Sequence, residues 1–182
     1  MNDQPISVRE RPLKSILRAP LGKSRIRRPA DGMYAGILPG TRLWLREAYF
    51  LHERFDRVSP SQAAKLGAEP TFSIDVADKH DPSLGLGCSR AAYTLPRPWH
   101  RYHLVLLEVK AEPLLEITEE DAKADGFGSR AAWLHEWDDL VGTIRTHDRS
   151  RSAKSNPTVL VMDVQLMTFP LDANPPQRKA AA

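Results

Sequence analysis

The apolar residues of three stretches, residues 41–49, 100–111 and 158–169, are arranged in a way that predicts β-strands. In the first and the last stretch, alternate side chains make one face mainly apolar, which is typical of a strand that packs on a core. The middle stretch is apolar on both faces around residues 104–107, which indicates a central strand of a sheet. We therefore expect these three strands to be neighbours.

Three other stretches, residues 12–19, 118–125 and 130–141, space their apolar residues as amphipathic helices do. Pro20 ends the first helix, because proline cannot continue one. The second helix begins with a capping-box pattern, in which the Thr118 hydroxyl accepts a hydrogen bond from the third amide of the helix. Together with the strands, these helices predict an α+β fold.

The length of the chain and the order of these elements predict one domain over residues 12–169. Residues 50–98 are rich in Pro, Gly, Ser and Asp and have weak periodicity, so we expect an irregular insertion there. Residues 1–11 are interpreted as a flexible arm and residues 170–182 as a disordered tail. A basic, serine-rich stretch at residues 145–154 is expected to be mobile.

Charge is distributed unevenly along the chain, although the net charge is only +3. Residues 1–30 carry eight basic and two acidic side chains, whereas residues 113–139 carry eight acidic and two basic ones. Clustered cations attract phosphates, so the first stretch suits a polyanionic partner, with ordinary solvated charge as the alternative. The acidic stretch is interpreted as the solvated face of helices.

Several classes of protein are not indicated by this sequence. The apolar stretches are too short to span a membrane, and the N-terminus lacks the apolar region of a secretory signal. A single cysteine, Cys88, cannot form an internal disulfide, so we expect a reduced, cytoplasmic setting. His100 and His103 would point to opposite faces of a strand, and the other histidines lack ligand spacing. We therefore expect no metal site and no cofactor.

Glu47 shares a face with the apolar residues of the 41–49 strand, so its side chain is predicted to point inward. An ionised carboxylate in such a place needs a partner. We favour an ion pair with Arg27 or Arg28, and the alternative is that Glu47 lines a ligand cleft.

Cations and an aromatic ring are interleaved just before the central strand, at Arg97, Trp99 and Arg101. Such a mixture suits contact with the bases and phosphates of single-stranded nucleic acid. The alternative is a tryptophan that packs under the stems of the arginines. Trp133 and Trp137, four residues apart, are interpreted as core residues of the last helix.

Six segments occur in a characteristic order along the chain. They are the basic residues 23–28, Pro-Gly-Thr-Arg-Leu-Trp-Leu-Arg-Glu from Pro39, Leu-Pro-Arg-Pro-Trp-His-Arg from Leu95, Leu-Leu-Glu-Val from Leu106, Ile-Thr-Glu-Glu-Asp-Ala-Lys-Ala-Asp-Gly-Phe from Ile117, and Asn-Pro-Thr-Val-Leu-Val-Met-Asp-Val from Asn156. In this combination the chain resembles the ASCH family of bacterial and phage proteins, over roughly residues 13–169. The resemblance implies a PUA-like β-barrel with flanking helices, and a nucleic-acid or nucleoside ligand in a cleft near the basic loop.

The loop motif of that family is Gly-x-Lys-x-x-Thr-x-Arg, and Lys23 and Arg28 match its lysine and arginine. Leu21 stands at the position of the glycine, with Gly22 one place later, and Ile26 stands at the position of the threonine.

Family members that hydrolyse N-acetylated cytidine use the motif's lysine and threonine together with a glutamate on a central strand, which Glu108 matches. The resemblance thus implies catalytic roles for Lys23 and Glu108, with Ser24 as a hydroxyl that could replace the missing threonine. The alternatives are that Lys23 is a solvated charge and that Glu108 pairs with Lys110 or an arginine.

Our first hypothesis is a binding module for RNA, another single-stranded nucleic acid or a modified nucleotide. In this hypothesis the ligand lies in a basic cleft formed by Lys23, Arg25, Arg27 and Arg28. The second hypothesis is a small amidohydrolase that acts on N-acetylated cytidine or a related nucleoside. We place it below binding because the threonine of the motif is missing. A ribonuclease is a further alternative, so the sequence leaves open whether the chain is an enzyme.

Overall fold

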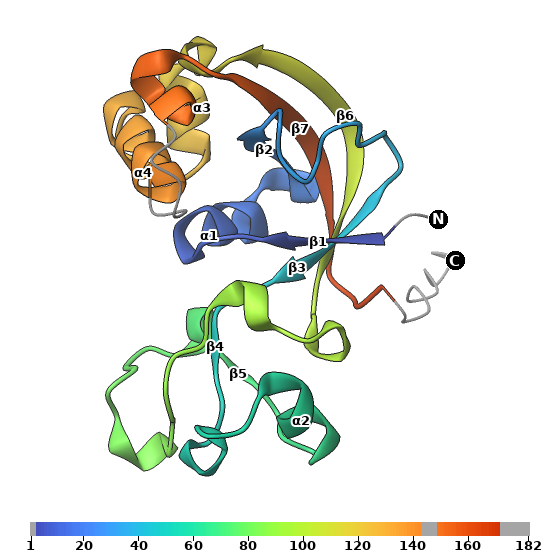
Figure 1. Ribbon diagram of the computed structural model, residues 1–182, viewed down its shortest axis with the longest axis vertical. Helices are drawn as coiled ribbons and strands as arrows, with labels where there is room; N and C mark the ends of the chain where they lie inside the picture. The colour runs from blue at the N-terminus through green and yellow to red at the C-terminus, as the bar shows by residue number, and fades with distance from the viewer. Residues whose placement is uncertain (1–2, 143–148, 172–182) are drawn as a thin grey trace, which may run out of the picture. The chain divides into compact units, whose positions relative to one another are not determined.

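The computed structural model describes residues 3–142 and 149–171 of the 182-residue chain. These residues form an α+β fold, as the sequence predicts (Figure 1). The strands are β1 (Asp3–Ser7), β2 (Lys23–Pro29), β3 (Arg42–Arg46), β4 (Tyr49–Phe50), β5 (Thr71–Phe72), β6 (His103–Pro113) and β7 (Thr158–Met167). The α-helices are α1 (Glu10–Arg18), α2 (Pro60–Lys65), α3 (Glu119–Ala124) and α4 (Arg130–Gly142).

Five strands are hydrogen-bonded into one mixed sheet in the order β1-β3-β6-β7-β2, and β4 pairs with β5 in a second, small sheet. The predicted neighbours β3, β6 and β7 therefore adjoin one another in this order. β1 is parallel to β3, whereas β2 is antiparallel to β7. Within the described residues the larger sheet is open, with β1 and β2 at its edges, and no closed barrel is formed.

The predicted flexible arm over residues 1–11 is wrong for the part that the structure describes. Residues 3–7 form β1, in which Ile6 pairs with Leu45 and is fully buried. An ion pair of 2.8 Å between Asp3 and Arg42 supports the same pairing. The apolar pattern missed this strand because Ile6 is its only large apolar residue, and its backbone hydrogen bonds come from a strand far along the chain.

The predicted basic loop at residues 23–28 is a strand, β2, which pairs with β7 from Lys23↔Gln165 to Pro29↔Val159. Ile26 is the only aliphatic residue of β2, so its sequence lacks the alternation by which strands are recognised. Charged residues and a terminal proline are nevertheless common in edge strands, where they block pairing with other chains.

The chain divides into two compact units, and the single domain over residues 12–169 stays a prediction. Within the described residues, the first unit comprises residues 3–10, 42–104 and 167–171, and the second comprises residues 11–41, 105–142 and 149–166. The predicted irregular insertion, residues 50–98, lies entirely in the first unit, where short 3-10 turns occur along the chain between and after β4, α2 and β5. Its core is formed by Tyr49, Leu51, Phe55, Ala63, Ala68, Phe72 and Leu95.

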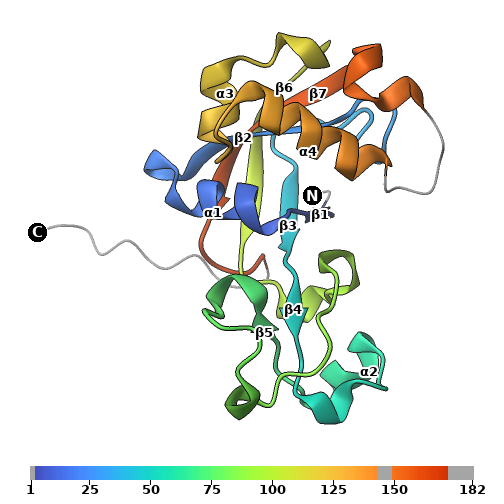
Figure 2. The same cartoon turned by 90° about the vertical axis from the view of Figure 1, so that its left-hand side faces the viewer.

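In the second unit, α3 and α4 lie along strands β2, β6 and β7 (Figures 1 and 2). Trp133 and Trp137 stack at 5.7 Å in the core between these elements, as predicted, together with Val159 and Val161 of β7. The predicted capping box of α3 is also present, since the Thr118 hydroxyl accepts from the amide of Asp121 at 3.0 Å.

Two sequence predictions fall largely outside the described residues. They are the disordered tail at residues 170–182, beyond residue 171, and the first part of the mobile stretch at residues 145–154, up to residue 148. Among the helices of the described ranges, none has both the length and the apolar character needed to cross a membrane.

We expect Gly126→Ala to destabilise the protein by about 2 kcal/mol, because alanine is strained at positive φ. Gly126 follows α3 with φ of 87°, and an added Cβ would lie 2.5 Å from the Ser15 Oγ atom. Gly128→Ala is the matched control, since a Cβ there meets nothing within 4 Å. Urea denaturation of both variants measures the difference, and equal midpoints would contradict the prediction.

Candidate functional site

Strand β2 directs two of its arginines toward acidic side chains of the same unit. The Arg27 side chain is only 2% exposed, and its Nη2 atom lies 2.8 Å from Asp121 and 3.5 Å from Glu112. The Arg25 Nε atom lies 2.7 Å from Asp163, and its Nη1 atom lies 3.1 Å from Asp121. Both arginines were predicted to bind nucleic acid, but in this structure they join β2 to β6, β7 and α3.

The pKa values of two carboxylates near Arg27 are shifted in opposite directions, although the charge of Arg27 acts to lower both. Burial disfavours the charged form of Asp121, but the Thr118 amide and the charge of Arg27 outweigh it, so the pKa of Asp121 is lowered. Burial raises the pKa of Asp125 from 3.8 to about 6, although Trp133 donates to it at 2.8 Å. The nearest cationic atom, Nη1 of Arg27, is 3.9 Å away and compensates little of the lost hydration.

Arg28 also serves the structure of this unit. Its Nη1 atom donates to the Arg27 carbonyl oxygen at 2.9 Å. Burial lowers the pKa of Arg28, while Tyr34 and Asp125 act against that shift. Of the predicted basic cluster at residues 23–28, Lys23 is exposed, Arg25 and Arg28 are half-buried and Arg27 is buried.

The exposed cations of this region lie mainly on α1. Figure 2 shows this helix, which precedes β2 in the chain. Residues 11–30 contain no acidic residue. Leu13 and Ile16 are buried, which turns Arg11, Lys14 and Arg18 toward solvent. We name the exposed cations Arg11, Lys14, Arg18 and Lys23 the α1–β2 surface. In the described part of the chain, Arg18 and Lys23 form no ion pair.

A tight turn joins α1 to β2 in the middle of this surface. The Gly22 amide donates to the Ala19 carbonyl oxygen at 3.0 Å, and Leu21 adopts φ 55° and ψ 17°. The Gln165 side-chain amide donates to the Leu21 carbonyl oxygen and fixes the turn to β7. Position 21 is where the ASCH loop motif has glycine, and a positive φ is the conformation that favours glycine.

The residues implied as a hydrolytic site do not gather around one point. Lys23 on β2 and Glu108 on β6 are both exposed, and β7 lies between their strands, so two strand spacings amount to about 10 Å. Ser24 follows Lys23 in the strand and therefore points to the opposite face. Ile26, at the position of the motif's threonine, is buried. The geometry therefore does not support hydrolysis, which rests on the resemblance alone.

Glu47 points inward as predicted and is only 1% exposed, but its partner is not Arg27 or Arg28. Arg101 binds it with two nitrogens, Nη2 at 2.6 Å and Nε at 3.2 Å, and its guanidinium also stacks on the Phe72 ring at 3.9 Å. Burial raises the pKa of Glu47, and Arg101 partly opposes the shift. Arg101, predicted to contact nucleic acid, therefore anchors a buried carboxylate in the first unit.

The other two residues of that predicted cluster also have partners within the first unit. The Trp99 ring packs edge-on against Tyr49 at 5.8 Å, on the apolar core of the unit. Arg97 is exposed, and its Nη2 atom lies 3.0 Å from Asp3. This arrangement is closer to the packed-tryptophan alternative than to an open stacking platform.

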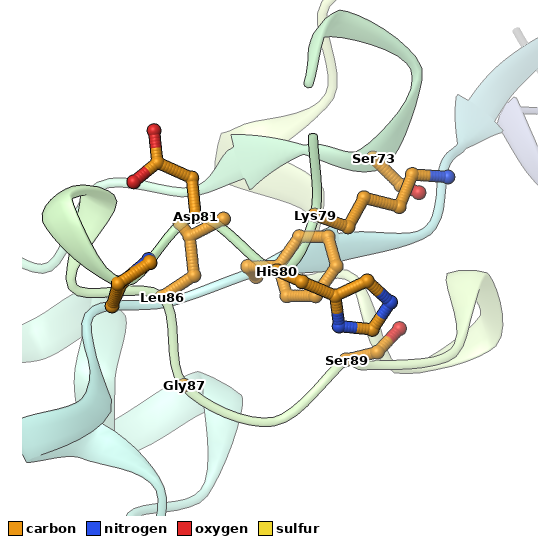
Figure 3. Close-up of a pocket in the computed structure, with 9 residues that line it drawn as sticks. Ser73, Lys79, His80, Asp81, Leu86, Gly87 and Ser89 are labelled. Carbon is orange, nitrogen blue, oxygen red and sulfur yellow. The ribbon is translucent and has the colours of Figure 1, made fainter. Parts of the chain in front are cut away.

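The first unit also contains a pocket of about 550 Å³, with Phe50 and Leu86 among its apolar walls (Figure 3). Figure 3 shows the Lys79, His80 and Asp81 side chains pointing in different directions. Lys79 pairs with Glu10 at 2.7 Å, and Asp81 accepts from the amide of Ser83. The charged groups thus do not converge on a point where a ligand or a reacting atom could lie.

Comparisons with protein-family models, with curated proteins and with solved structures gave no match.

The sequence prediction assigned nucleic-acid binding to the cations of residues 23–28, which are mostly half-buried or buried, and not to the exposed cations of α1. The spacing of Arg11, Lys14 and Arg18 opposite the buried Leu13 and Ile16 was the signal that could have identified the exposed ones. Amphipathic spacing predicts which face of a helix is outward, whereas a charge count does not.

We expect Arg27→Ala to destabilise the protein by about 3 kcal/mol or more, because it leaves carboxylates partly buried without their cation. Arg25→Ala, on the same face of β2 but with a side chain that is 38% exposed, should cost about 1 kcal/mol or less. Urea denaturation compares the two. Equal losses would show that the burial of Arg27 adds nothing.

We expect Asp125→Asn to change how stability depends on pH. Between about pH 4 and 6, folded Asp125 holds a proton that the unfolded chain has released, which stabilises the folded wild type at the acidic end. Relative to the variant, the wild type should gain up to about 3 kcal/mol as pH falls from 7 to 4. Chemical denaturation across this range measures the difference, and parallel curves would contradict it.

Proposed function

We propose that this protein binds single-stranded nucleic acid, RNA in the first place, through the α1–β2 surface. The observation that carries the proposal is the sorting of cations by exposure in an acid-free stretch of the chain. Arg25 and Arg27 of β2 are neutralised by Asp121, Asp163 and Glu112, whereas the cations of α1 and the first residue of β2 face solvent. Exposed cations next to one another attract phosphates and release counterions on binding.

The resemblance to the ASCH family supports the same reading. It implies a PUA-related fold and a nucleic-acid or nucleoside ligand beside the lysine of the loop motif, which is Lys23 here. Two features are in keeping with it: an α+β fold built on a mixed sheet, and a positive φ at position 21, where the motif has glycine. We propose a PUA-like relationship on these grounds, and with it a ligand that contains a base as well as phosphate.

The test is the salt dependence of RNA binding in a pair of double variants with the same change of charge. Each phosphate contact on a single strand contributes about 0.7 to the slope of log K against log salt. Arg18→Gln with Lys23→Gln removes two such contacts and should therefore lower the slope by roughly 1.4 and weaken binding at low salt. The control is Arg57→Gln with Lys65→Gln, two exposed cations of the first unit, which should leave the slope unchanged.

Fluorescence anisotropy with a labelled single-stranded RNA gives both slopes. Equal slopes in the two double variants would place the binding surface elsewhere. No binding by the wild type at low salt would end the proposal.

A further inference from the structure

Leu21 is the most exposed of the large hydrophobic residues that the structure describes, at 85%. It lies three residues after Arg18 and two before Lys23, so its Cα is within about 11 Å and 7 Å of theirs. A single exposed leucine is ordinary on a protein surface. This one is unusual because it stands among the cations of the α1–β2 surface and in a backbone conformation that leucine disfavours.

The conformation of Leu21 is close to that of the third residue of a type II turn, where glycine or asparagine is usual. The next residue cannot relieve the strain. Gly22 also has a positive φ, 67°, and a Cβ there would lie 2.9 Å from the Gln165 side-chain nitrogen and 3.2 Å from the Leu166 carbonyl oxygen. The turn is thus fixed by the backbone and by β7, and it does not depend on packing of the Leu21 side chain.

Strain of this kind at an exposed residue favours a role toward a ligand, since neither packing nor backbone preference explains a leucine there. The cations on either side define the ligand as an anion with an apolar face. A nucleotide with an unstacked base has both, because its phosphate meets the cations and its base can lie on an aliphatic side chain. A bilayer fits less well, because one leucine buries too little apolar area for stable membrane binding.

We infer that Leu21 packs against an unpaired base of a single-stranded nucleic acid whose phosphates are bound by Arg18 and Lys23. This inference rests on the function proposed above and adds the part of the ligand that the cations cannot recognise. In a duplex the base faces are stacked and covered, so Leu21 selects for single strands.

Leu21→Gly separates this role from a structural one, because the two predict opposite results. Glycine relieves the strain, so the melting temperature should rise by about 2–4 °C. The affinity for a short oligouridine should nevertheless fall about five- to tenfold, which corresponds to losing roughly half of a buried leucine. The salt slope should stay at the wild-type value, since no phosphate contact is removed.

Two further variants and a second probe complete the experiment. Leu21→Asn, which also tolerates positive φ, should reproduce the loss of affinity, whereas Leu21→Met should retain wild-type binding. The affinity for an RNA duplex of the same length should not change in any Leu21 variant.

If Leu21→Gly binds oligouridine like the wild type, or if binding of duplex and single strand falls equally, the inference is overturned while the proposed function stands. If the variant instead loses binding to vesicles of anionic lipid and not to oligouridine, the partner is a membrane and the inference also fails. A wild type that shows no salt-dependent binding to RNA fails the proposed function itself.

Discussion

The buried guanidinium of Arg27 is the interaction on which the second unit depends. It joins three elements that are distant in sequence, because it is held on β2 and bonds Asp121 of α3 and Glu112 of β6. Such a group adds little net stability, since each charge loses its hydration on burial. Its effect is to destabilise other registers of β2, because any shift of β2 along β7 would separate the buried cation from its carboxylates. The register of a strand with almost no apolar pattern is thereby fixed.

This internal pairing also decides which charges the molecule shows to its surroundings. The acids of α3 and β7 neutralise the inward arginines of β2, so they do not compete with a ligand for the cations of α1. A segment that is uniformly basic in sequence is thus divided in space into a structural half and an accessible half. A net charge of +3 for the chain hides this division.

The sequence predicted those elements whose apolar pattern is local, and it missed those that depend on contacts with distant segments. β6, β7, α3 and α4 were predicted because their apolar periodicity is local, and the pair Trp133 and Trp137 could be assigned to the core for the same reason. β1 and β2 were missed because their positions are determined by partners 39 or more residues away, not by their own composition. Glu47 shows most clearly what a local pattern can predict and what it cannot. Its inward direction follows from strand alternation, but its partner, Arg101, depends on how distant segments meet, which no local pattern encodes.

The pairing of β2 with β7 has a consequence for how the protein is made. Arg25 and Asp163 are 138 positions apart, so β2 can find its partner strand only after the long intervening segment has been synthesised. During synthesis, β7 has to emerge from the ribosome before β2 can pair with it. Contacts between residues so far apart in sequence slow folding, because the chain loses conformational entropy on closing the loop before the contact stabilises it. Until then the nascent chain presents Arg25 without its partner Asp163, next to a ribosome made largely of RNA.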